Sequence, residues 1–201
     1  MPRPRNFDEN VALDRAMTLF WRHGYDGTSL NDLTVSMGIN RPSLYATFGN
    51  KEALFRRALA RYGSGPTARV AAAFALPTAR ATVEELLSFY AEAPALPNRP
   101  LGCLLLNGAL GASAEAESVR VELSKVRTSL VTRLRKRLEV AQRTGELAGD
   151  ASPAELAQYF WAVLQGMAVQ ATDGATRAEL RKVARLAMAA WPERASSSRR
   201  P

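Results

Sequence analysis

Cysteine and histidine are nearly absent from this chain, which has 201 residues and only one of each, Cys103 and His23. A lone cysteine cannot form an internal disulfide, and these residues cannot supply a cysteine-based zinc site. Carboxylates do not cluster on a common helical face either, so no arrangement for acid–base, nucleophilic or metal catalysis can be assembled. We therefore expect no enzyme, no metal and no cofactor. His23 falls at the end of a predicted helix, where an imidazole suits the helix dipole.

Long apolar runs are also missing. No window of about 18 uninterrupted apolar residues occurs. The first residues, MPRPRNFDEN, lack the apolar core of a signal peptide. These absences predict a cytoplasmic protein with no membrane partner. No stretch has a convincing strand pattern, which favours an all-α fold.

Acidic residues are outnumbered, since 27 Lys and Arg face 19 Asp and Glu, for a formal net charge of +8. Such an excess favours a polyanion as partner. Part of it has another explanation, because residues 120 to 143 carry many basic side chains that a helix would leave in solvent. The charge agrees with nucleic-acid binding without requiring it.

The most informative pattern lies in residues 29 to 51, which predict two short helices joined by a tight turn. Ser29 and Asp32 have the spacing of a capping box, which opens the first helix. Gly38 can turn the chain through positive φ without a Cβ clash. Asn40 then caps the second helix, and a proline follows in its first turn, where the missing N–H is no loss.

The second helix is expected from about Arg41 to Phe48, with Leu44 and Phe48 on its buried side. Its remaining surface is basic, rich in hydroxyl groups and free of acidic residues: Arg41, Pro42, Ser43, Tyr45, Ala46 and Thr47. Such a face suits a groove lined by phosphates. The alternative is an αα-hairpin packed into another kind of helical protein.

Residues 24 to 55 resemble the DNA-binding domain of the TetR family of repressors through HGYDGTSL, MGINRPSLY and FGNKEALF. Thr34 and Pro42 depart from the commonest family pattern, which bears on the operator sequence and not on the fold. The resemblance implies that Thr28, Tyr45 and Lys51 contact phosphates, while Arg41, Pro42 and Thr47 face the bases. The DNA-binding residues implied in this way are Thr28, Ser29, Arg41, Pro42, Ser43, Tyr45, Thr47 and Lys51.

We expect the chain to divide into an N-terminal helix-turn-helix domain at 1–62, a larger helical effector-binding and dimerisation domain at 63–193, and a disordered tail at 194–201. The break is predicted at Gly63-Ser64-Gly65-Pro66. Helices in the N-terminal domain are expected at 7 to 23, 30 to 37, 41 to 48 and 51 to 62. In the larger domain they are expected near 67–76, 82–93, 102–113, 116–143, 153–173 and 176–191. A capping box at Ser152 and Glu155 is expected to open the helix that begins at 153.

The last two predicted helices carry apolar residues on more than one face, and small residues such as Gly166 would let another helix approach closely. The resemblance implies that this pair meets its two-fold mate in a four-helix bundle. The resulting homodimer places two recognition helices on successive major-groove turns, roughly 34 Å apart. The alternative is a monomer with both helices in its own core.

A pocket for an apolar or aromatic small molecule is predicted from apolar walls with a few neutral polar groups. The residues chosen for it are Phe89, Tyr90, Cys103, Asn107, Trp161 and Gln165. Each could equally be a core residue. Cys103 lies in a Gly-Cys-Leu element that resembles part of the family, at a predicted helix N-terminus that would stabilise a thiolate. It is a candidate sensor of electrophiles or oxidants, or an inert buried thiol.

These features favour a ligand-responsive transcriptional repressor that binds a palindromic double-stranded DNA operator as a homodimer. Two alternative functions remain. One is a regulator that is released from DNA by thiol modification at Cys103, and the other is a DNA-binding adaptor without an effector. Whether any compound weakens DNA binding separates the adaptor from the other two.

Overall fold

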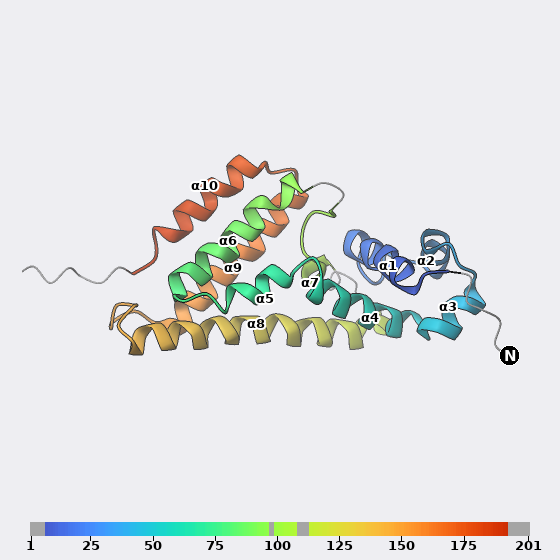
Figure 1. Ribbon diagram of the computed structural model, residues 1–201, viewed down its shortest axis with the longest axis horizontal. Helices are drawn as coiled ribbons and strands as arrows, with labels where there is room; N and C mark the ends of the chain where they lie inside the picture. The colour runs from blue at the N-terminus through green and yellow to red at the C-terminus, as the bar shows by residue number, and fades with distance from the viewer. Residues whose placement is uncertain (1–6, 97–98, 108–112, 193–201) are drawn as a thin grey trace, which may run out of the picture. The chain divides into compact units, whose positions relative to one another are not determined.

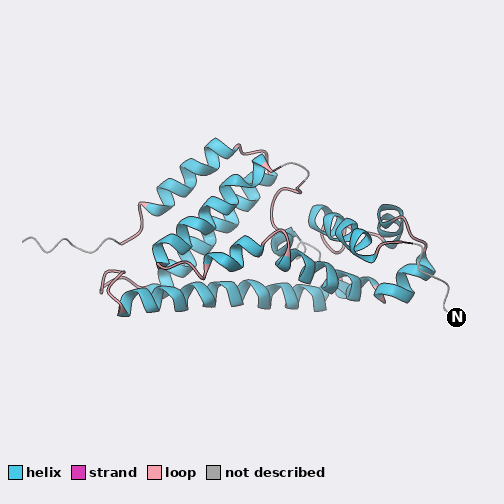
Figure 2. Ribbon diagram, in the orientation of Figure 1, coloured by secondary structure: helices cyan, strands magenta, loops and turns pink. Residues whose placement is uncertain are grey.

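The computed structural model describes residues 7–96, 99–107 and 113–192, and within these ranges the secondary structure is helical, with no strand (Figure 2). The all-α fold class is confirmed. The predicted tail at 194–201 and part of the helix predicted at 102–113 fall outside the described residues. The elements are α1 Glu9–His23, α2 Leu30–Met37, α3 Arg41–Phe48, α4 Lys51–Ser64, α5 Ala68–Ala73, α6 Ala79–Glu92, η1 Ala93–Ala95, α7 Leu104–Asn107, η2 Ala114–Ala116, α8 Glu117–Arg143, α9 Pro153–Thr172 and α10 Arg177–Met188 (Figure 1).

The chain forms two compact units, one made of residues 1–68 and 102–126 and the other of residues 69–101 and 127–201. Residues 102–126 thus pack with the N-terminal residues, although they follow α6 in the chain. The division into domains at residues 62 and 193 stays a prediction. The compact units differ from it because contacts between distant segments, and not chain order, decide what packs together.

In the first unit, α1 packs against α2, α4 and α7. Aromatic side chains fill its interior: the Phe20 and Phe55 rings meet edge to face with centroids 5.0 Å apart, and those of Trp21 and Tyr62 at 4.7 Å. All four are almost fully buried. Edge-to-face pairs of this kind add to the apolar burial that holds α1 against α4.

Polar contacts tie residues 102–126 to the N-terminal helices of the same unit. Asp26 accepts from the Ser113 hydroxyl at 2.7 Å and from the Ser113 amide at 3.1 Å. The hydroxyl bond is the largest cause of the lowered pKa of Asp26. On α4, the Arg56 Nε donates to Glu122 at 2.9 Å. These contacts join segments more than sixty residues apart, so no local pattern could predict them.

Several predicted helix ends are wrong by a few residues. The first helix begins at Glu9 and not Phe7, because the Asp8 carboxylate accepts from the amides of Asn10 and Val11 at 2.8 and 3.2 Å. At the other end of the unit, α4 continues through the predicted break to Ser64. A single glycine inside a helix costs only about 1 kcal/mol relative to alanine. Gly63 therefore does not end α4.

In the second unit, α6 packs against both α9 and α10. The core includes Phe160, Leu164 and Met167 of α9. Trp191 follows α10, which ends at Met188 and so is shorter than predicted, and its ring lies 6.3 Å from that of Phe160. None of the described helices is long and apolar enough to cross a membrane.

Three further helix predictions in this part of the chain need correction. Helix α6 begins at Ala79 and not at 82, because Thr78 accepts from the Ala81 amide at 3.1 Å. At Ser152 the side chain accepts from the Glu155 amide at 3.3 Å, but within the described residues the second reciprocal capping box forms at Thr176 instead. The helix predicted at 102–113 begins only at Leu104, in α7, and residue 113 is not helical, while residues 108–112 lie outside the described part of the chain.

Candidate DNA-binding surface

The capping box predicted at the start of α2 is confirmed. The Ser29 hydroxyl oxygen accepts from the Asp32 amide at 3.1 Å, and the Asp32 carboxylate accepts from the Ser29 amide at 3.0 Å. The Ser29 hydroxyl also donates to that carboxylate at 2.6 Å and holds the pKa of Asp32 below its usual value. Two amides at the helix N-terminus are satisfied in this way, and the carboxylate suits the positive end of the dipole. The chain therefore enters α2 in a fixed conformation.

The turn between the two helices is the left-handed turn that the sequence predicts. Gly38 has φ 70° and ψ 32°, and its amide donates to carbonyl oxygens of Thr34 and Val35. The next amide, that of Ile39, donates to the Thr34 carbonyl at 3.1 Å. A side chain at Gly38 would be strained in this backbone conformation. The turn sets the direction in which α3 leaves α2.

Helix α3 begins as predicted, because the Asn40 side chain accepts from the Ser43 amide at 2.9 Å. Leu44 and Phe48 are buried, with 0% and 3% exposure. The other side of the helix holds Arg41, Pro42, Ser43, Tyr45, Ala46 and Thr47, all exposed or half-buried. Tyr45 leaves 49% of its surface in solvent. The face therefore combines a guanidinium, three hydroxyl groups and no carboxylate.

Two of the residues predicted to contact phosphates, Thr28 and Lys51, lie outside α3, and they differ from each other in how far they are buried. Lys51, at the start of α4, is half-buried, with its ammonium 4.3 Å from the centroid of the Tyr25 ring. Thr28 is fully buried, and its hydroxyl donates to the Gly24 carbonyl at 2.7 Å. The Thr28 side chain thus stabilises the turn before α2, whereas the other predicted DNA-binding residues reach the surface.

Sequence reasoning missed two arginines that lie behind the helix-turn-helix. Arg15 of α1 donates to the Ser36 carbonyl near the end of α2, at 3.3 Å. Arg57 of α4 donates to the Thr47 carbonyl near the end of α3, at 3.0 Å. Both bonds join residues ten or more positions apart, and exposed arginines are too common to draw attention by themselves.

The six residues predicted to bind an effector are divided between the two compact units. Phe89 and Tyr90 of α6 and Trp161 and Gln165 of α9 belong to the second unit; Cys103 and Asn107 belong to the first. The Asn107 amide donates to the Trp21 carbonyl at 3.0 Å. Cys103 is 4% exposed, and the Tyr62 hydroxyl donates to its sulfur at 3.6 Å. Both side chains therefore serve the packing of the first unit.

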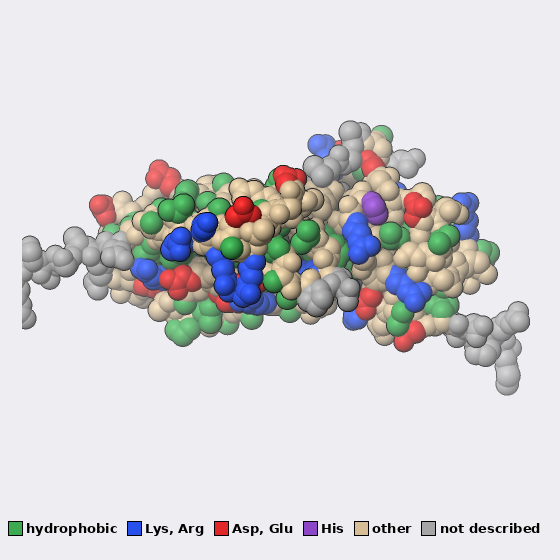
Figure 3. All heavy atoms as spheres, turned by 90° about the horizontal axis from the view of Figure 1, so that it is seen from above, with side chains coloured by type: hydrophobic (Ala, Val, Ile, Leu, Met, Phe, Trp, Pro, Cys, Tyr) green, Lys and Arg blue, Asp and Glu red, His purple; other side chains and the backbone are tan. Residues whose placement is uncertain are grey.

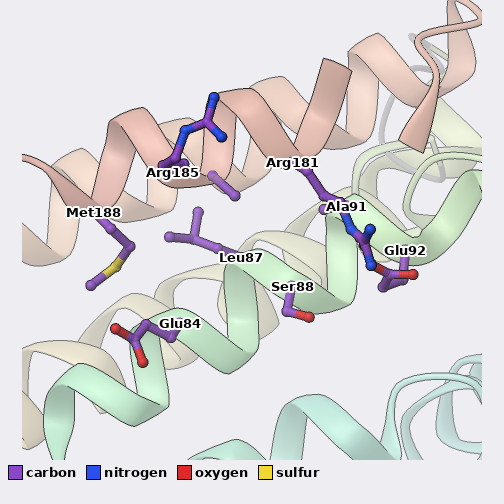
Figure 4. A pocket seen from close by; sticks show the side chains of 9 residues that line it. Glu84, Leu87, Ser88, Ala91, Glu92, Arg181, Arg185 and Met188 are labelled. Carbon is purple, nitrogen blue, oxygen red and sulfur yellow. Dashed lines mark hydrogen bonds and ion pairs between the residues drawn. The ribbon is translucent and has the colours of Figure 1, made fainter. Parts of the chain in front are cut away.

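A groove in the second unit runs between α6 and α10 and encloses about 230 Å³ (Figure 4). That volume is below the roughly 300 to 1,000 Å³ of typical ligand sites. Glu92 accepts from Arg181 at 2.8 Å and pairs with Arg177 at 2.6 Å. Burial raises the pKa of Glu92, but the two arginines outweigh it and the pKa is lowered. None of the predicted effector-binding residues lines this groove.

Charge on the surface is mixed. In the face shown in Figure 3, several Lys and Arg side chains lie close together, and Asp and Glu side chains lie beside them. Many arginines are paired, such as Arg61 with Asp14 at 2.8 Å and Arg135 with Glu139 at 3.3 Å. The net charge of +8 does not by itself locate a binding surface, and the local composition of α3 is the better guide to what binds there.

A short capped helix that presents a basic, hydroxyl-rich face after a left-handed turn defines a helix-turn-helix regulator. Two family models match the chain: bacterial regulatory proteins of the tetR family at residues 12–58, and the tetracyclin repressor-like C-terminal domain at residues 75–187. The chain therefore belongs to the TetR family of bacterial regulatory proteins.

Individual proteins agree with this assignment. The chain is 35% identical over 195 residues to the HTH-type transcriptional repressor ComR of Escherichia coli K12, covering 95% of this chain and 92% of ComR. A cysteine mutant of the TetR family transcriptional regulator CifR, complexed with 26-bp double-strand operator DNA, matches with TM-score 0.88 and 42% identity, over 94% of this chain and 100% of CifR. A TetR regulator from Chloroflexus aurantiacus shares the fold at 21% identity, with TM-score 0.73 over 89% of this chain and 90% of the other.

Proposed function

We propose that this protein is a cytoplasmic transcriptional repressor that binds a palindromic DNA operator as a homodimer and releases it when a small molecule binds. The α3 face carries the proposal, because it is exposed, free of acidic residues and held in a defined direction by the Gly38 turn. Two relatives support it: ComR is a transcriptional repressor, and the CifR mutant is complexed with operator DNA.

The roles proposed for these side chains on DNA are those that the family resemblance implies, and the exposure of the α3 face supports them. Tyr45 on α3 and Lys51 at the start of α4 contact phosphates, which fixes the register of the protein on the duplex. Arg41, Pro42 and Thr47 lie on the α3 surface and face base edges in the major groove. An arginine can donate two bonds to the O6 and N7 atoms of a guanine, so Arg41 is the main candidate for direct base recognition.

Substitutions on the two kinds of position are expected to have different effects. Lys51→Gln and Tyr45→Phe should weaken binding to all sequences alike, and the Lys51 change should reduce the slope of log affinity against log salt by about one. Arg41→Ala should cost about 1 to 3 kcal/mol at its preferred bases and flatten the preference there. Fluorescence anisotropy with cognate and scrambled duplexes at several salt concentrations measures both effects.

Lys125→Gln is the matched control, since it removes one charge from an exposed position on α8. It should leave both the affinity ratio and the salt slope close to those of the wild type. If Arg41→Ala weakens cognate and scrambled duplexes equally, Arg41 does not read bases.

Dimerisation is supported by apolar surface on α9 and α10 that a single chain leaves in solvent. Leu186 is 70% exposed, Val169 53% and Tyr159 40%. Gly166 lies in the middle of α9, and a Cβ added there would meet nothing within 4 Å. A mid-helix glycine costs about 1 kcal/mol relative to alanine, and nothing within the chain requires a glycine at this position. The close approach of a helix from a second copy would explain why a side chain is absent there.

Effector binding is proposed in the second unit, at the four predicted residues that it holds. Phe89 is buried under the guanidinium of Arg99, which lies 4.6 Å from its ring centroid, and its ring meets that of Tyr90 edge to face. Trp161 of α9 is half-buried. A ligand at these aromatic side chains can move the DNA-binding helices only if it binds one helix arrangement more tightly than another.

Apolar or aromatic compounds that release the operator should quench Trp161 fluorescence over the same range of concentrations. Trp161→Phe should abolish that change, which separates Trp161 from the buried Trp21 and Trp191. If release survives substitution of both Trp161 and Gln165, the effector binds elsewhere. If no compound weakens DNA binding, the protein acts without an effector.

The thiol alternative has its own control. If modification of Cys103 triggers release, electrophiles and oxidants should dissociate the wild-type complex but not that of Cys103→Ser. Because Cys103 is 4% exposed, reaction requires an opening of the first unit and should be slow. Release that persists in Cys103→Ser excludes this thiol as the sensor.

A further inference from the structure

The side chain of Arg57, on α4, contacts the C-terminal end of α3. Helix α3 has eight residues and no basic residue in its last turn. A helix this short is marginal by itself, and its last carbonyl groups have no partner within the helix. The Gly49 amide donates to the Tyr45 carbonyl at 3.0 Å. The Thr47 carbonyl takes its bond from Arg57 of α4, at 3.0 Å.

The Arg57 guanidinium makes two more contacts at the same place. Its central carbon lies 4.6 Å from the centroid of the Phe48 ring, within the range of a cation–π interaction. Its second terminal nitrogen lies 3.5 Å from the Glu9 carboxylate, in the first turn of α1. One planar group therefore connects the end of α3 with α4 and with the start of α1.

These contacts differ in weight. The Arg57 and Glu9 side chains are 42% and 30% exposed, so their ion pair is screened by solvent and adds little. The bond to the Thr47 carbonyl is charge-assisted and complements the negative end of the helix dipole. The planar fork allows Arg57 to donate to that carbonyl and lie over the Phe48 ring at once, which a lysine ammonium cannot reproduce.

We propose that Arg57 is a positioning residue for DNA recognition: through Thr47 and Phe48 it fixes the orientation of α3 without touching DNA. This inference rests on the proposed function for its effect on operator binding. Its structural part, the anchoring of α3, is independent of DNA. A side chain placed 1 Å away from its base contact loses much of the bond, so a looser α3 loses sequence preference before it loses general affinity.

The test compares Arg57→Gln and Arg57→Lys with Arg56→Gln in the full chain. Arg56 is the neighbouring residue of α4, has a similar exposed fraction of 50%, and pairs with Glu122 instead of contacting α3. Arg56→Gln and Arg57→Gln remove the same charge, so long-range attraction to DNA changes equally in both. The probes are the palindrome that the wild type selects from random duplexes and a scrambled duplex of equal length.

Arg57→Gln is expected to lower the ratio of palindrome to scrambled affinity about tenfold relative to Arg56→Gln, as expected for the loss of one charge-assisted bond. Its salt slope should equal that of Arg56→Gln. Arg57→Lys should fall between the wild type and Arg57→Gln. In the free protein, hydrogen exchange of the α3 amides should be faster in Arg57→Gln than in Arg56→Gln, while exchange in α9 and α10 stays the same.

A salt slope for Arg57→Gln that is lower than that of Arg56→Gln by about one would make Arg57 a phosphate contact and overturn the inference. Wild-type behaviour of Arg57→Lys would overturn it too, because charge alone would then suffice. Equal α3 exchange in Arg57→Gln and Arg56→Gln would overturn it without any DNA. If the wild type selects no palindrome, the proposed function fails, and the exchange measurement still decides whether Arg57 anchors α3.

Discussion

Leu186→Glu is expected to turn the protein into a monomer that keeps its helical content and loses most of its operator affinity. Leu186 is 70% exposed on α10, so its side chain packs little against the rest of its own chain. A carboxylate placed in an apolar helix seam would be buried without a partner, which the dimer cannot tolerate. Because the two half-sites are then bound independently, affinity should fall by about 10² to 10⁴. Sedimentation velocity, circular dichroism and DNA-binding titrations measure the three quantities.

Arg185→Glu is the matched control for this change. Arg185 neighbours Leu186 on α10 and is among the residues that line the groove between α6 and α10, although its guanidinium points away from α6 in Figure 4. We place it outside the proposed seam. The variant should remain a dimer. A wild type that sediments as a monomer at micromolar concentration, or a Leu186→Glu protein that still dimerises, would refute the proposed interface.

Phe55→Ala is expected to lower the free energy of unfolding by about 3 to 5 kcal/mol, the range for a buried aromatic residue replaced by alanine. Phe55 is fully buried, and its ring meets those of Phe20 and Tyr25 edge to face at 5.0 and 5.4 Å. Removing it leaves a cavity between α1 and α4. Urea unfolding followed by circular dichroism gives the change in free energy.

Tyr45→Ala removes a side chain of similar size at which 49% of the surface is exposed. Its unfolding free energy should change by less than about 0.5 kcal/mol, while its affinity for every duplex falls. The two aromatic residues should thus show opposite behaviour, one required for stability and the other for DNA binding. Equal losses of stability in both variants would contradict the assignment of Tyr45 to the DNA-binding face.

The helix-turn-helix could be predicted almost residue by residue because its determinants are local. The contacts of Ser29 with Asp32, of Asn40 with Ser43, and the positive φ of Gly38 all lie within a few residues, and each is found where the pattern places it. Caps and left-handed glycines depend on short-range chemistry that recurs in many proteins. The caps and the turn that set the direction of α3 could therefore be predicted from the sequence.

Long-range contacts could not be read in this way. Asn107 has the character of a pocket residue in the sequence, yet its amide donates to the carbonyl of Trp21, eighty-six positions away. In the sequence, nothing distinguishes Arg57 from an ordinary solvent-exposed residue of α4, and only the structure shows its contacts with Thr47 and Glu9. Thr28 matches a phosphate-contacting position of the family motif, and only the structure shows its hydroxyl buried against Gly24.

Recognition of a palindromic operator is tested most directly by selecting bound duplexes from random DNA with the wild-type full chain. We expect a two-fold symmetric consensus whose half-sites lie about one helical turn, roughly 34 Å, or a multiple of it, apart. Repeating the selection with Arg41→Ala should relax specific positions in each half-site and leave the spacing unchanged. No enrichment, or a consensus without two-fold symmetry, would contradict the claim that two copies of α3 read a palindromic operator.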